Sequence, residues 1–247
     1  MELNIVVVIQ ARMGSTRLPG KVMRMLGDRT VLGHVISRCQ AVTAVTEVVV
    51  ATSDSDKDDV IYEEAINNGV ICIRGSEEDV LSRYYEAATV VEADHIIRVT
   101  SDCPLLDPGI VESLISYYFD GGFDYARVGL DCFPRGLDAE IFSYEHLECS
   151  HKQAVSEFER EHVTQFILKR PDQFRIGIFR NNNSNDQSDA LYRLTVDTIE
   201  DWTLVSAIYQ ELYDGQIFCW ERVRKFLREN PSLAELNKDV EQKHPTT

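Results

Sequence analysis

The stretch "NIVVVIQ" (residues 4–10) is followed directly by the loop sequence "ARMGSTRLPGKV" (11–22). The first part is a continuous apolar run, which is typical of a strand buried on both faces of a parallel sheet. Ligands of such sheets bind in the loops at the carboxyl ends of the strands. The loop at 11–22 is therefore the first candidate for a binding site.

Strand and helix patterns alternate after this loop. We expect further strands at 46–52, 70–73 and 94–100, and helices at 30–42, 56–69, 77–93 and 107–119. A βαβαβαβ series of this kind predicts an α/β fold with a doubly wound, mostly parallel sheet.

Shorter elements are expected in the second half. The pattern indicates a charged helical stretch at 143–170, a strand pair at 173–181 and 190–197, and two late helices. Between the paired strands lies "NNNSNDQSD" (181–189), a polar turn. The tail at 230–247 reads as a surface helix that frays.

Length and composition favour one domain, 1–247, with a small appendage, because 247 residues that are 44% hydrophobic bury one substantial core. No apolar run approaches the ~20 residues that cross a bilayer, and no secretory signal is evident, so we expect a cytoplasmic protein. The six cysteines have no regular spacing, which predicts reduced, mostly core residues rather than a zinc site or disulfides.

Charge is unevenly distributed. The net charge of −16 argues against nucleic acid or an anionic membrane as partner, since both require a basic surface. Residues 1–38 nevertheless hold six basic side chains and only two acidic ones. A local cationic segment in an acidic protein suits a small polyanion.

The loop is not an ATP-binding P-loop. That motif has four residues between its glycine and the Gly-Lys pair, and Ser or Thr after the lysine. Here five residues separate Gly14 from Gly20, and Val22 follows Lys21.

The loop remains a good anion site. Gly14 permits close approach of the backbone, and three cations are available at Arg12, Arg17 and Lys21. Arginine binds phosphate oxygens in bidentate fashion and lysine adds a mobile point charge. A solvated basic loop without a ligand is the alternative interpretation.

Two aspartates follow expected strands. Asp102 comes after the strand at 94–100, and Asp197 ends the one at 190–197. Magnesium in a triphosphate site takes one or two protein carboxylates, so the pair is a candidate metal site. By spacing alone, each is more often a helix cap or turn residue.

The motif "QARMGSTRLPGKV" resembles the N-terminal signature of the cytidylyltransferases that make CMP-activated sugars, a group that includes the CMP-KDO and CMP-sialic acid synthetases. The branch of spore coat polysaccharide biosynthesis cytidylyltransferases is the most similar. The resemblance recurs at "ATSDSD", "RGSEEDVLSRYYEAA", "RVTSDCPLLDP", "FPRGLDAEIFS", "REHVT" and "LTVDTIEDW", so it spans residues 4 to about 207.

This resemblance implies a nucleotide-diphospho-sugar transferase-like, Rossmann-like sheet and Mg²⁺-dependent transfer of CMP from CTP to an acidic sugar or phosphorylated small molecule. Pyrophosphate would be released, in the synthesis of a surface polysaccharide such as capsule or lipopolysaccharide. It also implies a homodimer formed through an insertion at about 130–185.

The resemblance assigns site residues in four groups. The phosphate-side residues are Ala11, Arg12, Gly14, Ser15, Arg17 and Lys21. The base-side candidates are Thr52, Ser53, Arg74, Ser76 and Asp79. The metal ligands are Asp102 and Asp197, and the acceptor-side candidates are Arg135, Glu140 and His162. Catalysis falls to Arg12, Lys21 and Asp102.

Simpler interpretations stand beside several of these assignments. Ser76 with Asp79 also forms a helix capping box, and His162 on an apolar helix face is also a structural histidine. Cys103 occupies a position that is acidic in the KDO-activating enzymes. We expect a neutral, packed thiol there and an acceptor other than KDO.

Two other classes of protein compete with this interpretation. A nucleotide-sugar-dependent glycosyltransferase of similar topology usually carries an Asp-x-Asp motif, whereas "TSDCP" offers a single aspartate. A non-catalytic nucleotide-binding relative is disfavoured because the set of loop cations and aspartates is intact.

Overall fold

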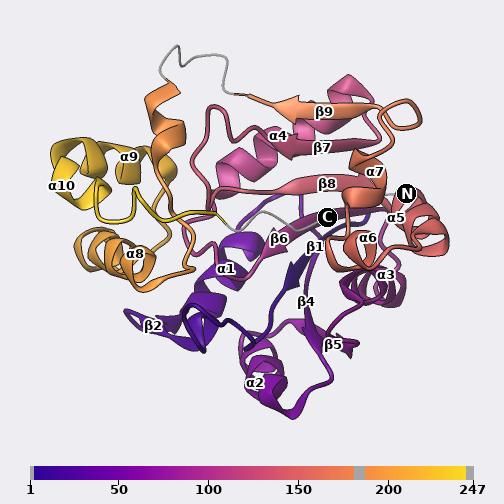
Figure 1. The fold of residues 1–247 in the computed structure, drawn as a ribbon, viewed down its shortest axis with the longest axis horizontal. Helices are drawn as coiled ribbons and strands as arrows, with labels where there is room; N and C mark the ends of the chain where they lie inside the picture. The colour runs from indigo at the N-terminus through magenta and orange to yellow at the C-terminus, as the bar shows by residue number, and fades with distance from the viewer. Residues whose placement is uncertain (1–2, 181–186, 243–247) are drawn as a thin grey trace.

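The computed structural model describes residues 3–180 and 187–242 and contains a seven-stranded sheet flanked by helices (Figure 1). The sheet strands are β1 (Ile5–Gln10), β4 (Glu47–Ser53), β5 (Ile71–Gly75), β6 (His95–Thr100), β7 (Tyr125–Val128), β8 (Glu140–Ser143) and β9 (Ile176–Phe179). The α-helices are α1 (Val31–Gln40), α2 (Asp59–Asn67), α3 (Val80–Val90), α4 (Pro108–Gly121), α5 (Tyr144–Gln153), α6 (Glu157–Glu161), α7 (Gln165–Leu168), α8 (Ile199–Leu212), α9 (Trp220–Glu229) and α10 (Pro231–Ala234). A small hairpin joins β2 (Met25–Leu26) to β3 (Arg29–Thr30), and single 3-10 turns are η1 (Lys21–Met23), η2 (Asp56–Asp58) and η3 (Gln187–Leu191).

The strand order is β5-β4-β1-β6-β8-β7-β9, and β8 runs antiparallel to both of its neighbours. All other sheet pairings are parallel. The prediction of a doubly wound, mostly parallel α/β sheet is therefore confirmed. Because β1, β4 and β6 are adjacent and parallel, the loops after them meet at one edge of the sheet.

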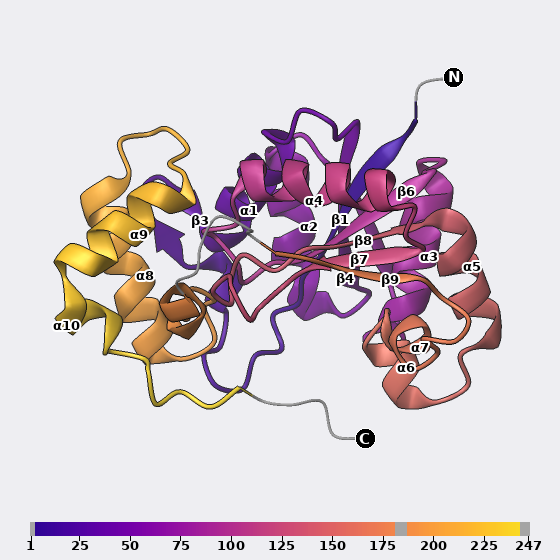
Figure 2. The same ribbon diagram turned by 90° about the horizontal axis from the view of Figure 1, so that it is seen from above.

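The apolar run in β1 supplies two hydrophobic cores, one on each side of the sheet. Ile5, Val7 and Ile9 join the core beneath α1, α2 and α4, whereas Val6 and Val8 join the core beneath α3 and α5. Figure 2 shows these helices in separate layers above and below the strands, with α8 and α9 at one end. A strand with no polar face is stable only in this central position.

Three expectations about the elements are wrong in detail. The segment 190–197 is not a strand: η3 covers its start, and its only ladder contact is an isolated bridge between Arg135 and Arg193. The helical stretch 143–170 is divided into α5, α6 and α7. The helix expected from residue 77 begins at Val80, with Asp79 as its N-cap.

The tail also differs from expectation. Within the described part of the tail, which ends at residue 242, only Pro231–Ala234 is helical after α9, and Asn237 is buried. The polar turn at 181–189 and the end of the tail lie largely outside the described residues. No disulfide joins any of the six cysteines, all of which are described. Cys39 and Cys103 are buried, and Cys72, Cys132 and Cys149 pack partly buried against the cores, whereas Cys219 is exposed. Within 3–180 and 187–242, no helix is long and apolar enough to span a bilayer.

Gly136, in the loop between β7 and β8, lets two distant segments touch. Its φ is 105°, and an added Cβ would lie 2.5 Å from the carbonyl carbon of Leu194. Leu194 also donates a backbone hydrogen bond to the carbonyl of Arg135 (2.7 Å). The segment that leads to Asp197 therefore packs directly against this loop at Gly136. Any other residue at this position would push the backbone of the two segments apart.

We predict that Gly136→Ala lowers the free energy of unfolding by about 3 kcal/mol, because backbone strain of about 1–2 kcal/mol adds to a backbone clash. Gly69→Ala is the matched control, since Gly69 also has positive φ (72°) but has nothing within 4 Å of an added Cβ. Urea unfolding measures both variants. Equal losses in the two would show that the contact with Leu194 contributes nothing.

Candidate functional site

A cavity of about 450 Å³ opens at the carboxyl ends of β1 and β6. It is lined by Gln10, Ala11, Arg12, Gly14, Ser15, Thr16, Arg17, Lys21, Val22, Val80, Arg83, Thr100, Ser101, Asp102, Glu161, His162 and Asp197. Nine of the residues expected from the sequence are among these, including all three loop cations and both aspartates. The structure thus brings the phosphate-side and metal-side candidates to one place.

The loop after β1 is held at both ends. The backbone N–H of Met13 donates to Asp58 Oδ1 (2.7 Å), and Ser53 Oγ donates to Asp58 Oδ2 (2.5 Å). Further along, Leu18 and Val22 are buried in the core beneath α1. Arg17 and Lys21 lie between the polar contact at Met13 and the buried Val22, and both line the cavity.

Lys21 is the central residue of the site. Its Nζ donates to Asp102 Oδ2 and to Asp197 Oδ1, each at 2.7 Å. The lysine side chain is 11% exposed, and the two carboxylates are 21% and 14% exposed. One ammonium group therefore bridges two aspartates that lie 95 residues apart in the chain.

Asp102 is positioned by its neighbours on β6 and by the segment before α8. Thr100 Oγ1 donates to Asp102 Oδ1 (2.6 Å), and the backbone N–H of Val196 donates to the carbonyl of Asp102 (2.8 Å). That backbone hydrogen bond places the segment carrying Asp197 directly beside the end of β6.

Asp197 is surrounded by cations. Its Oδ2 lies 3.1 Å from Arg17 Nη2 and 2.5 Å from Arg193 Nη2, in addition to the Lys21 contact. Beneath it, the fully buried Asp201 accepts from the N–H of Asp197 and from Arg193 Nε, both at 3.0 Å. Asp201 also forms a capping box with Thr198 at the start of α8.

The ion pair between Lys21 and Asp102 determines the protonation states of both groups. Burial lowers the pKa of Lys21, but the adjacent Asp102 and Asp197 outweigh it, so the net pKa is raised. Burial raises the pKa of Asp102, and Lys21 outweighs that effect and brings the pKa to about 2. At neutral pH the site therefore holds a charged lysine and an ionised Asp102.

The two aspartates fit a divalent metal ion. Magnesium takes carboxylate oxygens and completes its shell with water and phosphate oxygens, so two aspartates suffice. Asp102 and Asp197 already converge on a single cation, the Lys21 ammonium, which stands in the position of such an ion. Among the described residues there is no group of three or more His, Cys, Asp or Glu side chains arranged to hold a metal without other ligands.

Of the three acceptor-side candidates, one lines the cavity and two lie outside it. His162 lines the cavity, and burial lowers its pKa. Glu140 instead pairs with Arg98 across β8 and β6 (2.9 Å), and its other carboxylate oxygen is buried. Arg135 lies 3.8 Å from Asp138 and does not line the cavity.

The base-side candidates also lie outside this cavity. Arg74 hydrogen-bonds the carbonyls of Ser53 and Ser55 and pairs with Asp59, which makes it a brace for the loop after β4. Thr52 and Ser53 are buried at the end of that strand.

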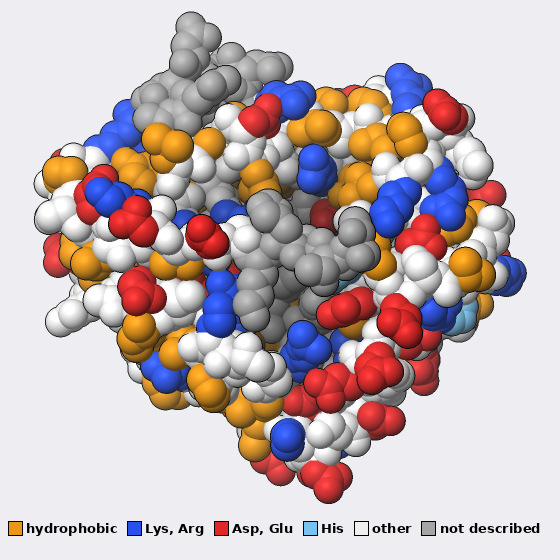
Figure 3. Space-filling view, viewed as in Figure 1, with side chains coloured by type: hydrophobic (Ala, Val, Ile, Leu, Met, Phe, Trp, Pro, Cys, Tyr) orange, Lys and Arg blue, Asp and Glu red, His pale blue; other side chains and the backbone are white. Residues whose placement is uncertain are grey.

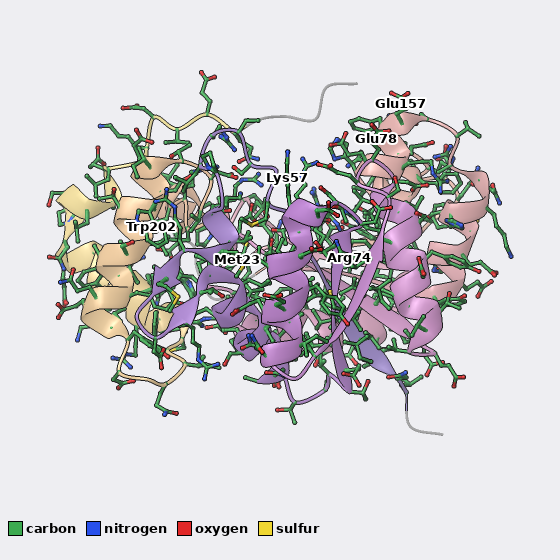
Figure 4. The ribbon with its side chains drawn as sticks, turned by 90° about the horizontal axis from the view of Figure 1, so that it is seen from below. Met23, Lys57, Arg74, Glu78, Glu157 and Trp202 are labelled. Atoms are coloured by element: carbon green, nitrogen blue, oxygen red, sulfur yellow. The ribbon has the colours of Figure 1, made fainter. Side chains whose placement is uncertain are left out.

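Ser76 and Asp79 line a second cavity of about 710 Å³ next to the first, and Arg12 and Glu161 belong to both. Its other lining residues are Glu77, Glu78, Val155, Glu157 and Arg160. Figure 4 shows Glu78 and Glu157 near each other at this edge, and Figure 3 shows acidic side chains gathered around α2 and α3. Asp79 pairs with Arg160 here (2.6 Å) and also caps the start of α3, so both of its contacts stabilise the fold.

Cys103 is a packed thiol, as expected. It is 2% exposed, and burial together with the charge of Asp102 raises its pKa. A thiol that remains protonated at neutral pH is a poor nucleophile.

Sequence reasoning missed Arg83. This residue in the first turn of α3 lines the cavity, is 2% exposed, and has two nitrogens, Nε and Nη1, with no hydrogen-bond partner among the described residues. Burial lowers its pKa. In the sequence, Arg83 looks like an ordinary charged residue of an amphipathic helix. Apart from its place in the quoted motif, nothing in the sequence distinguishes it as a binding residue.

Comparison with known proteins agrees with this geometry. The sequence profile of the family described as cytidylyltransferase matches residues 6–243. The chain is 35% identical to the spore coat polysaccharide biosynthesis protein SpsF of Bacillus subtilis over 236 residues, covering 94% of this chain and 97% of that protein.

Solved structures share the fold. A cytidylyltransferase from Leptospira borgpetersenii superposes with a TM-score of 0.84 at 31% identity, covering 99% of this chain and 100% of that one. A CMP-2-keto-3-deoxy-manno-octonic acid synthetase complexed with CTP has a TM-score of 0.63 at 22% identity over 85% of this chain and 100% of its own, and shows likeness of fold alone. The resemblance seen in the loop motif is confirmed over nearly the whole sequence, and the chain belongs to the cytidylyltransferase family.

Proposed function

We propose that the protein transfers CMP from CTP to an acidic sugar or a phosphorylated small molecule and releases pyrophosphate, as a step in surface polysaccharide synthesis. The observation that carries this proposal is the convergence of the loop cations on the two aspartates, with Lys21 Nζ 2.7 Å from each. Family membership supports the choice of CTP and of nucleotidyl transfer.

The loop residues bind and orient the triphosphate. Arg12, Arg17 and Lys21 line one cavity and supply three positive charges for a ligand with about four negative ones. The acceptor oxygen attacks the α-phosphorus in line with the departing pyrophosphate. This chemistry needs alignment and charge neutralisation rather than a covalent intermediate.

Asp102 and Asp197 would hold Mg²⁺, which polarises phosphate oxygens when bound. Arg193 and Asp201 keep Asp197 in place from below, through contacts at 2.5 and 3.0 Å. His162 has a lowered pKa and therefore faces the cavity as a neutral imidazole, able to hydrogen-bond a hydroxyl of the acceptor.

Arg83 supports selection of the nucleobase. It packs against Gly75 at the end of β5, whereas Asp102 follows β6, and β4 and β1 lie between these strands. A nucleotide with its phosphates at Lys21 would extend its base toward Arg83. A guanidinium group only donates hydrogen bonds, and cytosine presents acceptors at both N3 and O2, whereas uracil has a donor at N3.

The acceptor, the Mg²⁺ requirement and a homodimer formed through residues 130–185 stay predictions. No described contact bears on the dimer, and Arg135, expected to pair with an anionic acceptor, lies outside the cavity.

We predict that the protein with Mg²⁺ releases pyrophosphate from CTP in the presence of its acceptor, and not from UTP, ATP or GTP. A coupled pyrophosphate assay with a panel of acidic sugars and phosphorylated metabolites measures this. Transfer of a sugar from a nucleotide sugar, with no pyrophosphate formed, would contradict the proposal.

Lys21→Ala is expected to lower turnover by at least about a thousandfold, because it removes a charge that faces the phosphates in a dry site. Lys57→Ala is the matched control, since Lys57 is an exposed lysine on η2 that does not line the cavity. Near-native turnover in Lys21→Ala would remove Lys21 from the mechanism.

Arg83→Met is expected to lower kcat/KM for CTP about a hundredfold and to reduce the preference for CTP over UTP, since the lost donors discriminate the two bases. Its free energy of unfolding should not fall, because the variant removes a buried charge that has no ion-pair partner within residues 3–180 and 187–242. Unchanged preference combined with lower stability would identify Arg83 as a structural residue.

A further inference from the structure

The Lys21 ammonium occupies the position of a divalent cation between the two carboxylates. It contacts Asp102 Oδ2 and Asp197 Oδ1 at the same distance, 2.7 Å. Asp197 has two further cationic partners, Arg17 and Arg193, whereas Lys21 is the only ion-pair partner of Asp102 among the described residues. The pair of carboxylates is thus neutralised from within the chain.

The same ammonium is needed elsewhere once substrate binds. Two of its three N–H groups are used by the aspartates, and its side chain is 11% exposed. A triphosphate in the cavity competes with the aspartates for this group, and a metal ion competes with the ammonium for the aspartates. Each event favours the other: when the triphosphate takes the ammonium, the aspartates are left for the metal ion, and when the metal ion takes the aspartates, the ammonium is left for the triphosphate.

We propose that Lys21 acts as an internal cation that closes the carboxylate pair to divalent metal until a triphosphate draws the ammonium away. Metal and nucleotide then bind with positive coupling, and neither binds strongly alone. This inference rests on the proposed function, because it assigns the anionic ligand of Lys21 to the triphosphate. By linkage, the factor by which nucleotide strengthens metal binding equals the factor by which metal strengthens nucleotide binding.

Removal of the ammonium should expose the metal site. In the absence of nucleotide, Lys21→Met is expected to bind Mn²⁺ at least roughly tenfold more tightly than the wild type, a factor typical of coupled sites. Mn²⁺ electron paramagnetic resonance measures this without turnover. Addition of α,β-methylene-CTP, which is not cleaved, should strengthen Mn²⁺ binding by a larger factor in the wild type than in Lys21→Met.

Arg12→Met is the matched control for charge alone. Arg12 lines the same cavity, but its ion-pair partner is Glu77 rather than either aspartate. Its loss is expected to change Mn²⁺ affinity by less than about threefold, since the exposed charge is screened. An equal gain in Arg12→Met and Lys21→Met would overturn the proposal.

Lys21→Gln provides a second variant, which keeps a polar side chain between the aspartates if Lys21→Met does not fold. Circular dichroism checks the fold of each. If neither variant binds Mn²⁺ more tightly than the wild type, the proposal is wrong, even if CTP-dependent pyrophosphate release is observed. If Mn²⁺ binding strengthens while no nucleotide yields pyrophosphate, the proposed function falls and the exchange at Lys21 stands.

Discussion

The rest of the site depends on one interaction, the ammonium of Lys21 shared by Asp102 and Asp197. Two partly buried carboxylates placed together repel each other, and the ammonium between them offsets this repulsion. Lys21 also keeps the pKa of Asp102 at about 2, so this carboxylate is ionised at neutral pH. The shared ammonium also ties three distant parts of the chain to one point: the loop after β1, the end of β6 and the segment before α8.

Each of these parts is held by its own packing. Asp58 fixes the loop after β1 through a backbone N–H, so the loop does not rely on a ligand for its shape. Asp201 fixes Asp197 through its backbone and through Arg193, and Asn237 donates to Asp201 from the C-terminal segment (2.8 Å). Polar groups in this layer are paired, as a buried network requires. Arg83, by contrast, has two buried nitrogens without a partner among the described residues, as do single atoms of a few other side chains. An unpaired buried guanidinium in a cavity wall is the pattern of a ligand contact.

The sheet could be predicted from the sequence, and so could the residues that the fold brings together at the carboxyl ends of β1 and β6. The apolar runs at β1 and β4 are buried on both faces, so a central parallel position suits them, and the loops that follow them meet at one edge of the sheet. The prediction of a strand at 190–197 was wrong because the apolar residues of this segment, such as Leu194 and Val196, pack into the core without pairing to a strand. Buried position alone does not distinguish a strand from an extended segment.

Motif matching was less informative about single side chains. Arg74, Arg135 and Glu140 lie in quoted motifs, yet contacts within the protein occupy all three. A charged residue in a sequence shows neither its partner nor its direction, and only the folded chain shows which charged side chains line the cavity. The same limit hid Arg83, which is marked by the absence of a partner.

The most direct test is the position of a metal ion in a crystal of the protein grown with α,β-methylene-CTP and Mn²⁺. Our account predicts an anomalous manganese peak bound by Asp102 and Asp197, with Lys21 Nζ moved from the carboxylates to the phosphates. A manganese ion bound elsewhere, with Lys21 still bridging the two aspartates beside a bound nucleotide, would contradict it.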